Sequence, residues 1–129
     1  MLGSAVTGVD FVAVPSTDWQ RTRAFYVETL GLRPDSTGQA EFWVGDTCFG
    51  IYEPATYGME FAPQKTAHLA LHVEDMPAAR AELEARGVEF SGETFDTGVC
   101  HMAFFEDPDG NALMLHHRYT PREQGRYDA

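Results

Sequence analysis

Histidine and carboxylate side chains are the groups in this chain whose types and spacing could support chemistry. All five histidines, among them His68, His72, His101 and His116, lie in segments that read as β-strands, and Glu41 begins another such segment. Imidazole and carboxylate groups can hold a divalent metal ion together, or one can move a proton while the other orients it. What they can do depends on which faces of the strands they occupy.

The first of two predicted hairpins runs from Glu41 to Tyr52 and turns at Gly45-Asp46, a pair suited to a type II′ turn. Side chains alternate between the two faces of a strand, so residues directly opposite each other across a hairpin share a face. The pairs expected from this turn are Glu41 with Gly50 and Trp43 with Cys48.

The last hairpin runs from about Val99 to His117 and turns over Asp107-Pro-Asp-Gly-Asn111. Its register decides whether two histidines meet, because a slip of one residue turns a whole strand over. With Phe105 opposite Ala112, the further pairs expected are Ala103 with Met114 and His101 with His116. One common face would then carry Glu41, His68, His72, His101 and His116.

Three interpretations of this set stay open. The first is a displaced metal site made of His68, Glu41, and His101 or His116, since a divalent ion needs three or more such groups. The second is a metal-free acid–base site in which His101 or His68 moves a proton. Glu41 or Asp96 would orient that histidine. In the third, the histidines are ordinary polar side chains that line a partly wet cavity.

The predicted strands belong to a pattern that occurs twice. Phe11-Val-Ala-Val-Pro-Ser-Thr-Asp18 and His68-Leu-Ala-Leu-His-Val-Glu-Asp75 are each a short apolar strand that runs into a helix-opening aspartate. Their first residue is Phe in one copy and His in the other. Each half of the chain reads β-α-β-β-β, which predicts an α+β fold of two βαβββ modules.

The first module covers 9–53 and a linker covers 54–66. Its strand, 10–15, precedes a helix for which Thr17 is the expected N-cap, with Gln20 as its capping-box partner and Gly31 at its end.

The second module covers 67–118, and a polar tail, 119–129, completes a single domain that spans 1–129. The elements expected before its hairpin are a strand at 67–73, a helix from Asp75 through Arg86 that stops at Gly87, and a strand at 88–90.

Composition excludes several classes of protein. The net charge of −11, with only nine Lys and Arg, argues against nucleic-acid binding and is compatible with a cationic ligand. Cys48 and Cys100 cannot form a disulfide framework and lack the CxxC spacing of a zinc site. No apolar run is long enough for a membrane helix and the start lacks a basic signal-peptide region, so we expect a cytoplasmic protein without a membrane partner.

The chain resembles the vicinal oxygen chelate superfamily, which contains glyoxalase I, extradiol dioxygenases and bleomycin-resistance proteins. The residues that carry the resemblance are the repeated β-α-β-β-β plan, Phe25-Tyr26 followed by Leu30-Gly31-Leu32, His68 ahead of Asp75, and Asp107-Pro-Asp-Gly-Asn111. The resemblance implies that the two modules form a curved, cup-shaped mixed sheet, and that the protein is a homodimer.

In metal-dependent members of that superfamily, four strand positions hold a divalent ion. The resemblance maps them onto Phe11, Gly50, His68 and Met114, of which only His68 can ligate a metal through its side chain. We therefore expect no cofactor at the usual positions, and a divalent metal only at the displaced site described above.

The function that these features favour is sequestration of a small organic molecule, as in bleomycin resistance and hence antibiotic resistance. The ligand would be apolar or aromatic and could carry positive charge. The alternative is a lyase, isomerase or dioxygenase-type enzyme that uses the displaced metal site or metal-free acid–base catalysis. The expected pocket residues are Phe11, Trp43, Gly50, Tyr52, His72, Phe105 and Met114.

Overall fold

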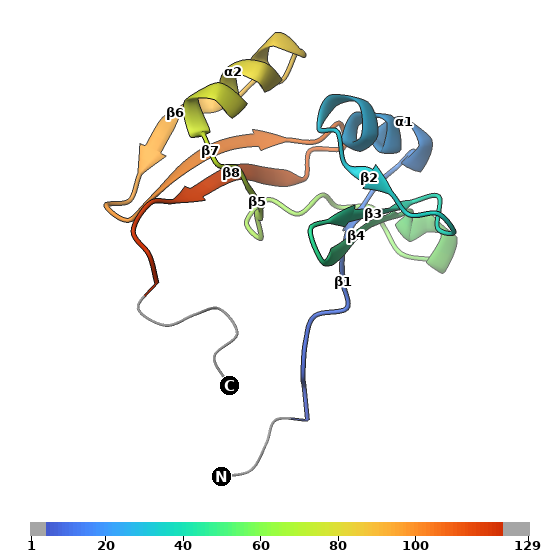
Figure 1. The fold of residues 1–129 in the computed structure, drawn as a ribbon. Helices are drawn as coiled ribbons and strands as arrows, with labels where there is room; N and C mark the ends of the chain where they lie inside the picture. The colour runs from blue at the N-terminus through green and yellow to red at the C-terminus, as the bar shows by residue number, and fades with distance from the viewer. Residues whose placement is uncertain (1–4, 123–129) are drawn as a thin grey trace. The chain divides into compact units, whose positions relative to one another are not determined.

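The computed structural model describes residues 5–122, which divide into two compact units (Figure 1). The first contains the chain up to Gln64 together with Pro108–Asn111, and the second contains the remaining described residues. Each unit has the β-α-β-β-β order, which confirms the α+β class with two βαβββ modules. Of the predicted polar tail, residues 123–129 lie outside the described part of the chain. No helix within the described residues has the length and apolar character to span a bilayer.

The first unit is built on a mixed four-stranded sheet. Its strands are β1 (Phe11–Pro15), β2 (Arg33–Pro34), β3 (Glu41–Val44) and β4 (Thr47–Tyr52), in the spatial order β1-β4-β3-β2. β1 runs parallel to β4, and the other neighbours are antiparallel. Gly45, in the β3–β4 turn, has φ +60, as the first central residue of a type II′ turn requires. The predicted pairs are confirmed, with Glu41 opposite Gly50 and Trp43 opposite Cys48.

One face of this sheet is covered by α1 (Trp19–Ala24) and a following π-helical turn, η1 (Phe25–Thr29) (Figure 1). Tyr26 of η1 is fully buried, and its ring centre lies 4.9 Å from that of Phe49 and 5.7 Å from that of Phe42. Aromatic pairs at these separations gain energy beyond the area that they bury. This aromatic cluster is the core of the first unit.

The N-cap of α1 is Asp18, so the prediction of Thr17 was wrong by one residue. Asp18 has extended backbone angles and its carboxylate accepts a hydrogen bond from the Arg21 backbone N–H at 3.3 Å. Thr17 is engaged elsewhere, because its N–H and its hydroxyl both donate to Asp109 Oδ1 at 3.0 Å. The expected capping box therefore does not form.

Asp109 is a carboxylate of the first unit that accepts several hydrogen bonds. Its side chain is 1% exposed and forms an ion pair with Arg21 Nη2 at 2.7 Å. The hydroxyl of Thr22 donates to its second oxygen. Burial opposes ionisation of this carboxyl group, but hydrogen bonds from Thr17, Thr22 and Ser16 outweigh that effect and lower its pKa. Residues 108–111 are thereby held against the start of α1.

The second unit repeats the plan with β5 (Leu69–His72), α2 (Met76–Ala85), β6 (Ser91–Asp96), β7 (Cys100–Glu106) and β8 (Ala112–Arg118). Its sheet has the order β5-β8-β7-β6, with β5 parallel to β8. Asp75 caps α2 as predicted and accepts from the Ala78 N–H at 3.0 Å. α2 covers one face of the sheet (Figure 1). The buried apolar residues of this unit include Leu71, Met76, Leu83, Ala103, Phe105, Leu113 and Leu115.

The prediction of a strand at 88–90 was wrong, because the structure has no strand there. The chain leaves α2 through Gly87, which has φ +95, and Val88 donates its N–H to the Leu83 carbonyl at 3.0 Å. This hydrogen bond caps the helix end and keeps Val88 out of the sheet. β6 begins three residues later, at Ser91, and its pairing with β7 is interrupted by a register shift between Ser91 and Phe95.

The register predicted for the last hairpin was also wrong, by one residue. Glu106 pairs with Ala112, so the turn holds five residues between them. The pairs observed in place of the predicted ones are Phe105 with Leu113, Ala103 with Leu115 and His101 with His117. This register buries the apolar residues of β7 and β8 together, and a slip by one would place them on the opposite face.

We expect Asp109→Asn to lower the free energy of unfolding at pH 7 by about 1 to 3 kcal/mol, because a neutral amide accepts these hydrogen bonds less strongly. The pKa of Asp109 is lowered in the folded state. Its stabilising effect is therefore complete above the unfolded Asp pKa of about 3.9, and is lost as the pH falls through the folded-state value. Urea denaturation followed by circular dichroism measures both effects.

Asp46→Asn, in the exposed β3–β4 turn, is the matched control. The stability difference between wild type and Asp109→Asn should shrink as the pH falls from about 5 towards 2, because wild type then loses the same charge. A difference that stays constant over this range, or that Asp46→Asn reproduces, would contradict a role for the Asp109 charge.

Candidate ligand-binding site

A hollow of about 490 Å³ opens on the first unit, on the face of the sheet that carries Glu41. The register brings Phe11 beside Cys48, and Ala13 and Glu41 to the two sides of Gly50. These residues alternate with the buried residues of the aromatic core, so they face away from α1 and η1. Residues lining the hollow include Phe11, Ala13, Glu41, Gly50, Tyr52 and Tyr57.

The carboxylate of Glu41 contacts Cys48 and lies close to Gly38. The thiol of Cys48 donates to its Oε2 at 3.2 Å. A Cβ atom on Gly38 would collide with its Oε1, so the carboxylate occupies space that only glycine leaves open. Glu41 has no Lys, Arg or His partner among residues 5–122, and none of these residue types lines the hollow there. The arrangement presents an anion whose charge is not balanced inside the hollow.

Cys48 is buried, with 7% of its surface exposed. Burial raises the pKa of its thiol, and the hydrogen bond to Glu41 and the charges of Glu41 and Asp35 act in the same direction. The thiol therefore stays protonated and serves as a hydrogen-bond donor to the carboxylate. A protonated, buried thiol is a poor nucleophile.

Aromatic side chains form much of the wall of the hollow. Phe11 is 63% exposed and Tyr57 is 69% exposed, although both are large apolar residues. Tyr57 belongs to a short 3-10 helix, η2 (Pro54–Tyr57), which directly follows β4 and Tyr52. Exposed aromatic rings grouped around a concavity are typical of sites for small organic ligands.

Three of the predicted pocket residues, Phe11, Gly50 and Tyr52, line this hollow, and the others do not. Trp43 lies on the same face of the sheet, where its Nε1 donates to Asp35 Oδ1 at 2.8 Å. Phe105 is 2% exposed and packs against Phe90, on the face of the second sheet that α2 covers. Its predicted place in the cup was wrong, as a consequence of the register slip. Met114 and His72 lie on the other face of that sheet.

The predicted histidine set is divided between the two faces of the second sheet. His116 pairs with His72 and Met102, and His68 packs edge-on against Phe104, with ring centres 5.3 Å apart. These side chains lie on the face away from α2. His101 stands on the α2 face instead, so its predicted meeting with His116 was wrong.

The histidines have separate polar partners. His72 Nε2 lies 2.8 Å from Glu74, and His101 Nε2 lies 3.6 Å from Asp96. Burial lowers the pKa of His116, and the nearby charge of His72 adds to the effect. Asp96 was predicted to orient a proton-transferring histidine, and it is the carboxylate beside His101.

The residues at the usual metal positions of the resembled superfamily do not fit a metal ion. Phe11 and Gly50 offer no ligating atom in their side chains, and Met114 offers only a thioether. Within the described part of the chain, no three His, Cys, Asp or Glu side chains are grouped so that they could hold an ion. Within the second unit, His101 and His116 stand on opposite faces of the sheet, so the three histidines of the displaced set do not share one face.

Comparison with known proteins gives several matches. Residues 8–115 match the family model described as Glyoxalase/Bleomycin resistance protein/Dioxygenase superfamily. The uncharacterized protein YaeR of Escherichia coli is 31% identical over 121 residues, which cover 84% of this chain and 94% of YaeR. TnmS3, an antibiotic binding protein from a Streptomyces species, is similar in structure with a TM-score of 0.70 and 28% identity, over 90% of this chain and 99% of its own. A superfamily member from Sphaerobacter thermophilus has a TM-score of 0.73 at 22% identity, over 86% and 97%.

We expect Glu41→Gln to accelerate alkylation of Cys48 by iodoacetamide in the native protein. Removal of the carboxylate's charge lowers the thiol pKa, and each unit of pKa corresponds to about a tenfold change in thiolate. The rate of alkylation is measured by mass spectrometry of the Cys48 peptide. A several-fold faster rate is the result expected if the Glu41 carboxylate contacts the thiol. Cys100, whose Sγ lies 3.1 Å from the Thr97 hydroxyl, is the internal control. Equal acceleration of both thiols would indicate general opening of the fold and contradict a specific effect.

Proposed function

The chain belongs to the Glyoxalase/Bleomycin resistance protein/Dioxygenase superfamily, and we propose that within it the protein sequesters an aromatic small molecule that carries positive charge. Binding would take place in the hollow beside Glu41, without a metal ion at the family's usual positions. Two independent properties of the hollow support this proposal: the unbalanced charge of Glu41 and the aromatic side chains that line the hollow.

The observation that carries the proposal is the unbalanced carboxylate of Glu41 inside an aromatic hollow. Cys48 satisfies one oxygen as a neutral donor and leaves the negative charge in place. A cation that enters the hollow would neutralise this charge, and its aromatic part could pack against Phe11 and Tyr57. A ligand anion would be repelled by Glu41.

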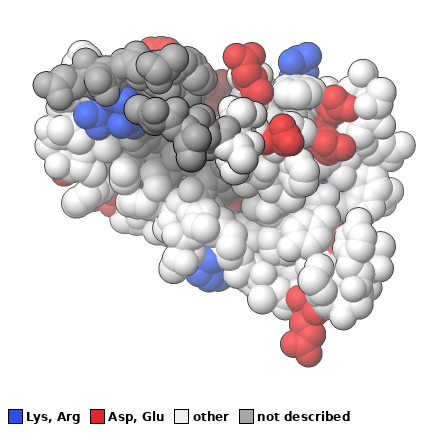
Figure 2. All heavy atoms as spheres, turned by 90° about the horizontal axis from the view of Figure 1, so that it is seen from below, with Lys and Arg blue, Asp and Glu red and all other residues white. Residues whose placement is uncertain are grey.

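The surface charge and one relative add support. The face drawn in Figure 2 is largely uncharged, with more carboxylates than basic side chains scattered over it, as expected for a chain of net charge −11. Such a surface favours the approach of cations. TnmS3, at 28% identity, is an antibiotic binding protein, so ligand capture occurs among the relatives of this chain.

The homodimer, the cytoplasmic location and a role in antibiotic resistance stay predictions. Enzymatic activity of the lyase, isomerase or dioxygenase type stays a prediction as well, and the described residues provide no grouped metal ligands for it.

The binding test compares two aromatic probes of the same shape, 1-methylquinolinium, a cation, and 1-methylnaphthalene, its neutral counterpart. We expect saturable binding of the cation, measured by calorimetry and by tryptophan fluorescence, and weaker binding of the neutral probe. Glu41→Gln should raise the Kd of the cation about tenfold, as expected for loss of one interaction with a charged group. It should leave the Kd of the neutral probe nearly unchanged.

Gly38→Ala tests the position of the charge without removing it. Its Cβ would displace the flexible end of Glu41, so cation affinity should fall while the fold persists. Glu28→Gln, an exposed carboxylate of η1 that does not line the hollow, is the matched control and should have no effect. Failure of both probes to bind would overturn the proposal, and equal binding of both would remove its cationic part.

A further inference from the structure

Gly50 is a glycine that neither its backbone conformation nor its packing requires. It is buried and lines the hollow of the first unit, so it forms part of the floor of that hollow. It is not among the glycines with positive φ, so a residue with a side chain could adopt the same conformation. A Cβ atom built there would meet only the Ala40 carbonyl oxygen at 3.5 Å and the Glu41 Cγ at 3.7 Å, which is ordinary van der Waals contact.

Glycine has a cost at this place in the sheet. Gly50 lies within β4, which is hydrogen-bonded to β1 on one side and to β3 on the other. Glycine inside a strand weakens it, because it has no side chain to pack and loses more conformational freedom on folding than other residues. Such a glycine often marks a place where a ligand comes close to the backbone. The floor of the hollow at Gly50 is therefore where we expect a ligand to approach the sheet most closely.

The neighbours of Gly50 across the sheet are a short side chain and a charged one. Ala13 of β1 pairs with Gly50 on one side, and Glu41 of β3 pairs with it on the other. These three residues form a row across three strands, and because neighbouring strands lie about 4.8 Å apart, the row is about 10 Å long. Ala13 is exposed, so the row has a low floor that ends at the Glu41 carboxylate.

Aromatic side chains stand on both sides of this row. Phe11 comes two residues before Ala13 on β1, and Tyr52 comes two residues after Gly50 on β4, and both line the hollow. Residues two apart in a strand project from the same face, about 7 Å from each other. The row is thus a trough with small residues along its floor, an aromatic side chain on each side and a carboxylate at one end.

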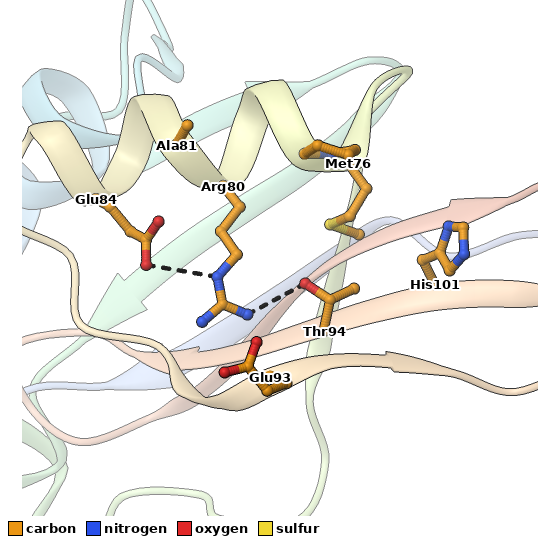
Figure 3. Close-up of a pocket in the computed structure, with 8 residues that line it drawn as sticks. Met76, Arg80, Ala81, Glu84, Glu93, Thr94 and His101 are labelled. Carbon is orange, nitrogen blue, oxygen red and sulfur yellow. Dashed lines mark hydrogen bonds and ion pairs between the residues drawn. The ribbon is translucent and has the colours of Figure 1, made fainter.

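The hollow of the second unit, between α2 and the strands β6 and β7, is built differently (Figure 3). The side chain of Arg80 crosses it, where its Nη1 donates to the Thr94 hydroxyl at 3.1 Å and its Nε lies 3.5 Å from Glu84. A charged side chain thus already fills the space between the helix and β6. The open floor of the first hollow is the better fit for a flat ligand.

From this geometry, and resting on the function proposed above, we propose that the ligand is a flat, fused-ring aromatic cation whose ring face lies over Ala13 and Gly50. Its charge is at the edge of the ring system, in the ring plane, because the Glu41 carboxylate stands at the end of the row. Phe11 and Tyr52 contact the long edges of the rings. Gly50 is then a specificity-determining residue, because the missing side chain lets the ring face approach the sheet.

The experiment compares two cations of the same two-ring skeleton, 1-methylquinolinium, which is flat, and 1,1-dimethyldecahydroquinolinium, which is saturated and puckered. By calorimetry we expect the flat cation to have a Kd at least tenfold lower. Nuclei that lie over the face of an aromatic ring are shielded. In NMR spectra of the complex with the flat cation, the Ala13 methyl and the Gly50 α-protons should therefore move upfield.

Gly50→Ala should raise the Kd of the flat cation about tenfold, because one added methyl group lifts the ring face from the floor. The Kd of the puckered cation should change less than twofold. The thermal midpoint should not fall, since alanine is more favourable than glycine inside a strand. Gly8→Ala is the matched control, because Gly8 does not line the hollow and has open space around its Cβ position. It should change neither Kd.

The outcomes separate this inference from the proposed function. Binding of neither cation to the wild type would overturn the proposed function and this inference with it. Binding of the flat cation that Glu41→Gln weakens and Gly50→Ala does not would support the proposed function and overturn the inference. Equal Kd values for the two cations, or a downfield shift of the Ala13 methyl, would also overturn the inference.

Discussion

The buried carboxylate of Asp109 connects parts of the first unit that are far apart in the sequence. It accepts hydrogen bonds from Thr17, 92 residues earlier, and forms an ion pair with Arg21. Asn111, in the same turn, is fully buried and donates to the Pro15 carbonyl at 2.8 Å. The end of β1 and the start of α1 are thus fixed by a turn from the last hairpin.

Much of the fold follows from patterns that are local in sequence. The repeated strand and aspartate predicted both βαβββ modules, because each copy is a short apolar run followed by an aspartate that can open a helix. The β3–β4 register also followed from one glycine with positive φ. These features are decided within a few residues, so the amino-acid pattern contains enough information to predict them.

The errors arose where distant contacts outweigh local preference. Thr17 is a good N-cap by residue type, but its backbone N–H and its hydroxyl both donate hydrogen bonds to Asp109. The register predicted for the last hairpin was off by one residue, because the length of its turn depends on the contacts of residues 108–111. The local sequence does not specify those contacts. This error in the predicted register assigned both His101 and Phe105 to the wrong face of the sheet. Gly38 and Tyr57 gave no signal in the sequence, since their roles depend on the path of the chain around β3 and after β4.

The absence of ligating side chains at positions 11 and 50 and the formation of the hollow have a common structural origin. Gly50 stands opposite Glu41 and beside Ala13, and a Cβ placed there would lie 3.7 Å from the Glu41 Cγ. That is ordinary van der Waals contact, so a longer side chain at this position could be accommodated only by extending into the hollow. With glycine at this position and phenylalanine at position 11, the surface offers space and an aromatic wall in place of ligating atoms. In the function proposed above, the charge on Glu41 is the group that attracts the ligand cation into this space.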